Sequence, residues 1–211
     1  MKTASILIGA MMILASCAVA QDLQDVVLSP PRVEGGLPLM QALKERQSTR
    51  SFSANKLPLQ VLSDLLWAAA GINRPDSGKR TAPSALNWQE IEVYAVMPEG
   101  VFRYDAGAHV LKAIAAGDFR ALTGKQEFAA KAPLNLVYVA DTSKMKGVST
   151  ENRDLFMGAD TGFISQNVYL FCASENLMTV VRASMEREAL ARVLKLSEQQ
   201  KITLAQTVGY L

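Results

Sequence analysis

The spacing of apolar side chains predicts two helices near the start of the folded part of the chain. Met40, Leu43 and Arg46 recur at helical spacing. Pro58 opens a second pattern, in which apolar residues lie on one face of a helix until Gly71 ends it. We therefore expect two amphipathic helices in this region.

Apolar runs further along the chain predict the strands. Residues 91–96 are typical of a strand, residues 98–100 of a tight turn, and residues 101–104 of the returning strand of a β-hairpin. A continuous apolar run over residues 134–140 indicates a central strand. The remaining expected elements are short strands over 179–181 and 202–208 and a helix over 186–195.

Residues 155–173 are apolar on nearly every side of a helix, which predicts a long buried helix and not a membrane span. Cys172, within this stretch, is expected to be a small core residue. Gly158 and Gly162 lie one turn apart and would let another backbone approach closely. That backbone belongs either to a second subunit or to this same chain, and the sequence favours neither.

The first twenty residues are typical of a targeting segment. Lys2 precedes an apolar run that is too short to span a bilayer, and small residues end the segment at Ala20. Cleavage after Ala20 would release an exported, periplasmic protein. Residues 14–17, Leu-Ala-Ser-Cys, also resemble a bacterial lipobox. Lipidation of Cys17 would instead tether the protein to a membrane.

The domain organisation follows from these patterns. After a signal peptide over residues 1–20, Pro and Gly residues predict an extended N-terminal arm over residues 21–37. Residues 38–211 form the folded domain. Helices and strands alternate there without repeats or linkers, so we expect a single α+β domain.

Composition and charge narrow the range of functions. The chain has 211 residues, and its 22 Lys and Arg against 20 Asp and Glu give a net charge of +2. This balance argues against a nucleic-acid partner. With 49% hydrophobic residues, the chain has the composition of an ordinary folded domain.

The sequence lacks the residues that several kinds of catalytic chemistry require. His109 is the only histidine, so neither a metal site nor a Cys-His or Ser-His pair is expected. We expect His109 to be a surface or helix-start residue. The sequence also lacks the glycine-rich loops that bind dinucleotides and phosphates.

Two polar segments carry candidate chemistry. In the first, Arg46, Ser48 and Arg50 stand at alternating positions, so an extended backbone would place all three side chains on the same side. Two guanidinium groups and a hydroxyl suit a phosphate monoester, although a solvated surface would explain the same residues. The second segment, residues 80–89, combines small and hydrogen-bonding residues, which suits close contact with a ligand ring or a simple turn capped by Ser84.

Five motifs, taken together, resemble the flavin-dependent nitroreductase superfamily, especially its branch near the SagB-type thiazole-forming dehydrogenases. They are E-R-Q-S-T-R-S-F, R-T-A-P-S-A-L-N-W-Q-E-I-E-V-Y, G-V-F-R-Y-D, D-T-G-F-I-S-Q-N-V-Y-L and the closing V-G-Y. The resemblance covers essentially residues 37–211. It implies a nitroreductase-like fold with a central antiparallel or mixed sheet flanked by helices, and a homodimer with two FMN molecules at the subunit interface.

The resemblance also implies a set of FMN-binding residues. The family's contacts with the FMN phosphate and ribityl chain correspond here to Arg46, Gln47, Ser48 and Arg50. The loop that the partner subunit lays against the flavin ring corresponds to Pro83, Ser84, Ala85 and Asn87. Val181 and Arg182 match the strand end beside the reactive edge of the ring, where the charge of Arg182 would stabilise reduced flavin.

The function implied is an exported FMN-dependent oxidoreductase. Flavin N5 would carry hydride or electrons from a small-molecule donor to a small planar acceptor, with no side chain acting as a catalytic acid or base. The donor, whether NADH, NADPH or another reductant, and the physiological substrate stay open. The alternative is a non-catalytic protein that binds flavin or another ligand on the same dimeric scaffold, or a structural protein that keeps only the scaffold.

Overall fold

The computed structural model describes residues 22–211, so the predicted signal peptide and Cys17 lie outside the described residues. The helices are α1 (Leu39–Glu45), α2 (Leu59–Ala70), α3 (Glu127–Lys131), α4 (Thr150–Ser174) and α5 (Arg187–Val193). The strands are β1 (Val26–Val27), β2 (Ile72–Arg74), β3 (Lys79–Arg80), β4 (Ile91–Met97), β5 (Gly100–Asp105), β6 (Val110–Ala116), β7 (Leu134–Asp141), β8 (Met178–Arg182) and β9 (Gln200–Gly209).

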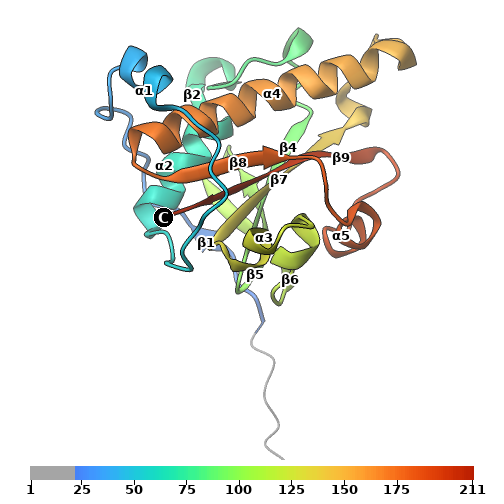
Figure 1. The fold of residues 1–211 in the computed structure, drawn as a ribbon. Helices are drawn as coiled ribbons and strands as arrows, with labels where there is room; N and C mark the ends of the chain where they lie inside the picture. The colour runs from blue at the N-terminus through green and yellow to red at the C-terminus, as the bar shows by residue number, and fades with distance from the viewer. Residues whose placement is uncertain (1–21) are drawn as a thin grey trace, which may run out of the picture.

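A seven-stranded sheet organises the molecule, with the strand order β1-β6-β5-β4-β7-β9-β8. Every neighbouring pair in this sheet is antiparallel, so of the two expected sheet types the antiparallel one is present. β2 and β3 form a separate two-stranded hairpin. With helices on both faces of the sheet, the chain has the predicted α+β architecture (Figure 1).

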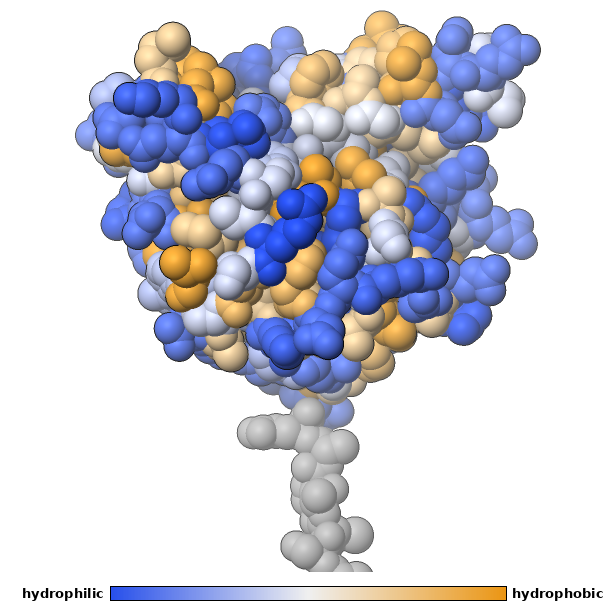
Figure 2. Space-filling view, in the orientation of Figure 1, coloured by the Kyte–Doolittle hydropathy of each residue, from blue (hydrophilic) through white to orange (hydrophobic). Residues whose placement is uncertain are grey.

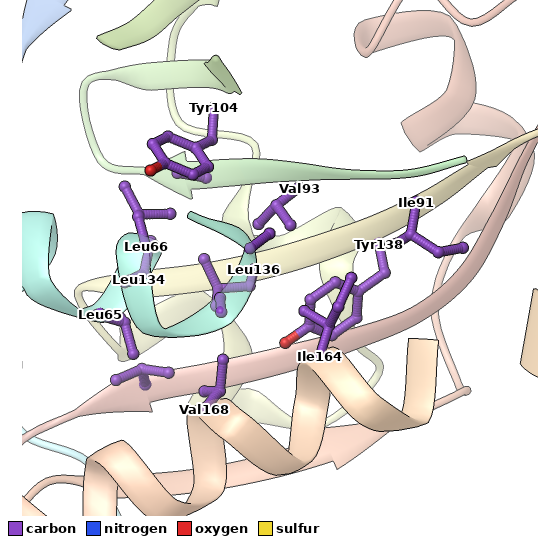
Figure 3. Packing of buried hydrophobic residues seen from close by; sticks show 14 of the residues in the cluster. Leu65, Leu66, Ile91, Val93, Tyr104, Leu134, Leu136, Tyr138, Ile164 and Val168 are labelled. Carbon is purple, nitrogen blue, oxygen red and sulfur yellow. The ribbon is translucent and has the colours of Figure 1, made fainter. Parts of the chain in front are cut away.

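Two hydrophobic clusters hold the helices to the sheet. On one face, α2 and α4 pack against the inward side chains of β4 and β7, as Figure 3 shows for Leu66, Val93, Leu136 and Val168. On the other face, Leu190 of α5 packs with side chains from β4, β7 and β9. Because β7 is covered on both faces, its side chains are almost all buried, which explains its continuous apolar sequence.

The long helix α4 is buried on one side only. Its side chains toward the sheet, such as Ile164 and Val168, are buried, and Cys172 is fully buried as predicted. On the opposite side, Leu155 and Phe163 are 67% and 46% exposed. The expected burial on nearly every side is therefore not met within a single chain. No helix in residues 22–211 is long and apolar enough to cross a membrane.

The two glycines of α4 also face away from the rest of the chain. A Cβ atom built on Gly158 or Gly162 would meet no described atom within 4 Å apart from the neighbouring backbone of α4 itself. Packing against another segment of the described chain is therefore not why these positions are small. Figure 2 shows apolar atoms among the polar ones along the upper edge of the molecule, the edge along which α4 runs in Figure 1.

The arm before α1 lies against the folded body. β1 pairs with β6, and the Arg32 side chain forms an ion pair with Asp64 on α2 at 2.7 Å. The backbone N–H of Leu37 donates to Ser174 Oγ at 2.7 Å, at the C-terminal end of α4. These contacts bring the start of α1 next to that end of α4 (Figure 1).

His109 differs from its predicted role. It lies in the turn between β5 and β6 with a φ of 52°, and it does not begin a helix. Its half-buried ring hydrogen-bonds Ser63 Oγ at 2.7 Å and the Tyr104 hydroxyl at 2.9 Å, and its Nε2 lies 3.0 Å from the Ser29 carbonyl. With both ring nitrogens occupied, His109 ties the arm, α2 and β5 together.

Candidate functional site

The segment after α1 runs in extended form along the edge of the sheet. The Thr49 N–H donates to the Thr179 carbonyl at 3.0 Å, and the Thr179 N–H donates to Thr49 Oγ1 at 3.2 Å. This extended exit is the conformation that places alternate residues on one side. Arg46 and Ser48 both reach Tyr169 on α4, which shows that their side chains share a side.

Tyr169 connects the segment to β8. Its ring lies 5.4 Å from the Arg46 guanidinium, a cation–π distance. Its hydroxyl lies 2.8 Å from Ser48 Oγ and accepts the Val181 N–H at 3.0 Å. One buried side chain therefore fixes Arg46, Ser48 and the exposed edge of β8 relative to one another.

β8 is an edge strand, which leaves one row of its backbone groups available. Thr49 and Tyr169 satisfy the outward N–H groups of Thr179 and Val181. By strand alternation, the next outward N–H along this edge is that of Ala183, an exposed residue. The strand end thus offers a backbone donor beside Val181.

Arg182 turns into the protein. It is 8% exposed, and its guanidinium donates to Thr207 Oγ1, to Asn135 Oδ1 at 2.7 Å and to Thr123 Oγ1 at 3.0 Å. Its Nε has no hydrogen-bond partner among the described residues, and the group lies over the Phe128 ring. Burial lowers the pKa of Arg182 to about 10.

The cation on Arg182 is not neutralised within the site. All of its hydrogen-bond acceptors are neutral hydroxyl and amide oxygens. In residues 22–211, no acidic group contributes to its pKa shift. A buried guanidinium without a nearby carboxylate leaves a positive potential at the end of β8.

The second predicted segment forms a strained loop. It contains a 3₁₀ turn at Ala85–Asn87, and Leu86, Asn87 and Gln89 have φ values of 48°, 57° and 50°. A positive φ costs free energy in residues other than glycine. Three such residues in one loop indicate a conformation that the surrounding structure holds in place. Leu86 is 80% exposed, so the loop presents a large apolar side chain to its exterior.

Two hydrogen bonds hold this loop. Ser84 Oγ accepts the Gln89 N–H at 2.9 Å, so the hydroxyl closes the loop from within. The turn role considered for Ser84 is therefore present, although the hydroxyl caps no helix. The Ala85 N–H donates to Asp160 Oδ2 on α4 at 2.9 Å. Pro83 and Asn87 are exposed.

The structure brings only part of the predicted set together in one chain. Arg46, Gln47, Ser48 and Arg50 lie beside β8, together with Val181 and Arg182. The loop that contains Pro83, Ser84, Ala85 and Asn87 is anchored elsewhere on α4, at Asp160. Tyr169 lies nine positions after Asp160, which is about 13 Å along a helix. The two halves of the predicted site are therefore separate in the single chain.

A cavity of about 330 Å³ opens between the Lys44–Thr49 segment and the end of α4. This volume lies at the lower end of the range for small-molecule sites. Polar groups from both elements line it. The lining residues include Arg46, Gln47, Thr49, Tyr169, Asn176 and Thr179.

Sequence reasoning missed Thr49 and Tyr169. A tyrosine within a predicted buried helix needs a hydrogen-bond partner for its hydroxyl, and this signal could have pointed to Tyr169. Thr49 carries no such signal, because its role depends on backbone pairing with a strand 130 residues away.

Known proteins resemble this chain in sequence. The family model described as Nitroreductase family matches residues 43–210. A curated relative from Methanocaldococcus jannaschii, named as a candidate nitroreductase, is 30% identical over 170 residues, which cover 76% of this chain and 85% of that protein.

Solved structures show the same fold. A crystal structure of a candidate nitroreductase from Ralstonia eutropha is 42% identical, has a TM-score of 0.85 and matches 92% of each chain. A chain of the E. coli microcin synthetase complex has a TM-score of 0.68 and covers 97% of this chain and 84% of its own length. At 20% identity, this second likeness concerns the fold alone.

Proposed function

The chain belongs to the nitroreductase family, and from its site we propose that it is an FMN-dependent oxidoreductase that works as a homodimer. The observation that carries the proposal is the placement of Arg46, Ser48 and Arg50 on one extended segment beside the open end of β8. Bound FMN supplies electron transfer between a small-molecule donor and a small planar acceptor.

The donor set of the segment fits the tail of FMN. A phosphate monoester carries close to two negative charges at neutral pH and three acceptor oxygens. Arg46 and Arg50 provide guanidinium groups that can bind such oxygens in pairs, and Ser48 provides a hydroxyl. Gln47 is exposed next to them and can hydrogen-bond ribityl hydroxyls.

The strand end fits the flavin ring. The outward backbone edge beyond Val181 offers the N–H of Ala183 as a hydrogen-bond donor, and the Arg182 side chain is turned inward. The buried charge of Arg182 makes this place more favourable for a group that gains negative charge. These residues bind and orient the cofactor, and none needs to transfer a proton.

A second copy of the chain would complete the site. The loop over Pro83–Asn87 is strained, presents Leu86 to its exterior and lies apart from Arg46 in its own chain. The exposed side of α4, with Gly158, Gly162 and Phe163, offers small and apolar residues for contact with a second α4. We propose that dimerisation across this surface places one subunit's loop against the FMN of the other.

The phosphate contact is tested by titrating FMN into the Arg50→Gln variant. Arg50 is exposed, so we expect the variant to fold normally and to bind FMN at least tenfold more weakly, since a hydrogen bond to a charged group is worth about 1.5–3 kcal/mol. Arg74→Gln, an exposed arginine on β2, is the matched control and should bind FMN as the wild type does. Equal affinity of all three proteins would contradict the proposal.

Catalysis is tested separately from binding. The FMN-loaded protein is mixed with NADH or NADPH, and loss of the visible flavin absorption is followed. Reduction by either donor supports a nicotinamide-driven enzyme. A protein that binds FMN stably could instead show no reduction by NADH or NADPH and no electron transfer to planar acceptors after chemical reduction of its flavin. That result would favour the alternative, a non-catalytic flavin or ligand-binding protein.

We also propose that the protein is exported, on the basis of residues 1–20 alone. Fractionation of cells that express the full chain should place it in the periplasm. A membrane-bound fraction that Cys17→Ser releases would favour the lipoprotein alternative. Retention in the cytoplasm with the leader intact would contradict export.

A further inference from the structure

Two acidic side chains lie buried behind the loop of residues 83–87. Glu90 is fully buried directly before β4, and no N–H or O–H group of the described residues donates to either of its carboxyl oxygens. Asp160, on α4, is 2% exposed, and its Oδ2 accepts the Ala85 N–H. A buried carboxylate without donors is strongly disfavoured relative to its protonated form.

The pKa of Glu90 depends on Asp160. Burial is the main cause that raises the pKa of Glu90 to about 7, and the charge of Asp160 and a hydrogen bond with it raise the pKa further. A protonated Glu90 has one O–H donor, and Asp160 has acceptor capacity beyond the bond to Ala85. One proton shared by the pair thus satisfies groups that would otherwise repel each other.

The other charged groups around Glu90 do not replace this proton. Lys144 lowers the pKa of Glu90 but forms its ion pair with Glu92, at 3.4 Å. Asp141 donates its backbone N–H to the Glu90 carbonyl, and its carboxylate accepts a hydrogen bond from the Ser143 N–H. From β3, Arg80 directs its Nε to Gln89 Oε1 at 2.9 Å.

The surrounding space excludes a separate catalytic role for the pair. The cavity beside Asp160, lined by Pro83, Ser84 and Gln89 among others, has a volume of about 20 Å³. Such a space holds about one water molecule and no substrate. The pair can therefore affect only the neighbouring parts of the protein. Its hydrogen bond to the loop is the one that Asp160 accepts from the Ala85 N–H.

We propose that Glu90 and Asp160 share one proton and that this protonated pair holds the loop of residues 83–87 in the conformation required for FMN binding. The inference rests on the proposed function, because it assigns this loop to the flavin site of the partner subunit. Loss of the proton would leave two carboxylates side by side without solvent. Asp160 would move away from Glu90 and release Ala85, so the pair makes FMN affinity depend on pH near neutrality.

The test is the dissociation constant of FMN for the dimeric protein between pH 7 and pH 9, measured by flavin fluorescence. The phosphate, with a second pKa of about 6, is already dianionic in this range and does not add a pH dependence. We expect the wild-type dissociation constant to rise at least tenfold from pH 7 to pH 9. Glu90→Gln, whose amide donates to Asp160 at every pH, should give a flat profile.

Two further variants keep the result interpretable. Glu99→Gln changes an exposed carboxyl just beyond the far end of β4 and should keep the wild-type profile. Asp160→Asn retains an acceptor for Ala85 and removes one charge, so it should also flatten the profile and serves if Glu90→Gln does not fold. A flat wild-type profile with tight FMN binding would overturn the inference while leaving the proposed function intact.

Infrared spectroscopy of the protein without FMN tests the shared proton directly. The wild type should show the carbonyl band of a buried carboxylic acid that disappears with a midpoint near pH 7, and Glu90→Gln should lack this band. Absence of the band in the wild type would refute the shared proton even if FMN did not bind at any pH. Failure of FMN binding with the band present would instead contradict the proposed function.

Discussion

At the scale of single residues, Tyr169 contributes most to the geometry of the site. Its hydroxyl joins Ser48 to the Val181 backbone, and its ring supports Arg46. Removal of the hydroxyl in Tyr169→Phe leaves the ring in place but leaves the Val181 N–H without its acceptor. We expect a loss of about 1 kcal/mol in the free energy of unfolding and a several-fold weaker affinity for FMN.

Tyr94→Phe is the matched control for this prediction. Tyr94 is also buried and hydrogen-bonded, but to Glu92 and in the cluster on the opposite face of the sheet. Removal of the Tyr94 hydroxyl should lower the free energy of unfolding without changing the affinity for FMN. If both variants bound FMN as the wild type does, Tyr169 would be only a core residue.

The buried charge of Arg182 predicts an effect on reduction potential. Arg182→Gln should make reduction of bound FMN less favourable, because the positive potential at the end of β8 is lost. We expect the midpoint potential to fall by tens of millivolts, since about 1.4 kcal/mol corresponds to about 30 mV for a two-electron couple. Arg182→Lys, which keeps the charge, should largely restore the potential; equal potentials for the wild type and Arg182→Gln would remove this role.

Glu90 predicts how stability changes with pH. Its pKa in the folded protein, about 7, lies above the ordinary value of 4.5, so the folded state binds more protons than the unfolded state between these values. The stabilisation is complete below about pH 4.5 and is lost as the pH rises through 7, by on the order of 3 kcal/mol.

Chemical denaturation at pH 5 and pH 8 checks this sign. The wild type should lose more stability than Glu90→Gln as the pH rises from 5 to 8. Asp25 and Asp118 have lowered pKa values, so their contributions are lost only as the pH falls below about 4. Parallel changes in the wild type and the variant would show that Glu90 does not titrate in this window.

At the scale of elements, α4 has two functions on opposite sides. One side carries the core and the anchors Asp160 and Tyr169, and the other carries Gly158 and Gly162, which have no neighbour from another segment of residues 22–211. Gly162→Leu should therefore leave the folded chain at least as stable, because a leucine favours the helix by up to about 1 kcal/mol over glycine. In a dimer built on this surface, the same leucine would force the helices apart.

Sedimentation measures this effect. We expect Gly162→Leu to shift the protein from dimer to monomer and to abolish FMN binding with it. Ala130→Leu places the same side chain on an exposed position of α3 and should remain dimeric. A Gly162→Leu protein that is still a dimer with wild-type FMN affinity would show that the interface lies elsewhere.

The elements themselves were largely predictable, because α2 has a regular apolar period, β4 and β5 have the residues typical of strands, and α4 and β7 contain long apolar runs. β6 was not predicted, since Lys112 and the small residues around it show no strand pattern, and its pairing comes from β5 and the arm. β1, β2 and β3 were missed for a related reason. Their two or three residues form strands only because a partner lies beside them.

The candidate site was predictable where it rests on local sequence. Alternation placed Arg46 and Ser48 together, and the structure has the extended backbone that this requires. The anchors came from tertiary packing, as with Tyr169 and the pairing of Asp160 with Ala85. Sequence alone cannot show that Glu90 lacks donors, because that depends on which groups surround it after folding.

At the scale of the whole molecule, the two halves of the proposed FMN site belong to different subunits. A mixture of two inactive variants tests this arrangement. Arg46→Gln combined with Arg50→Gln removes the phosphate half, and Pro83→Glu places a charge on the exposed loop of the other half. In a mixed dimer, the intact loop of the first variant would meet the intact arginines of the second.

The decisive measurement is therefore the amount of FMN bound after the two variants are unfolded and refolded together in equal amounts. Each variant alone should bind almost none, and the mixture should bind about a quarter of the wild-type amount, because half of the randomly formed dimers have one complete site. Recovery at that level would support a flavin held between subunits. No recovery, with mixed dimers demonstrably present, would contradict it.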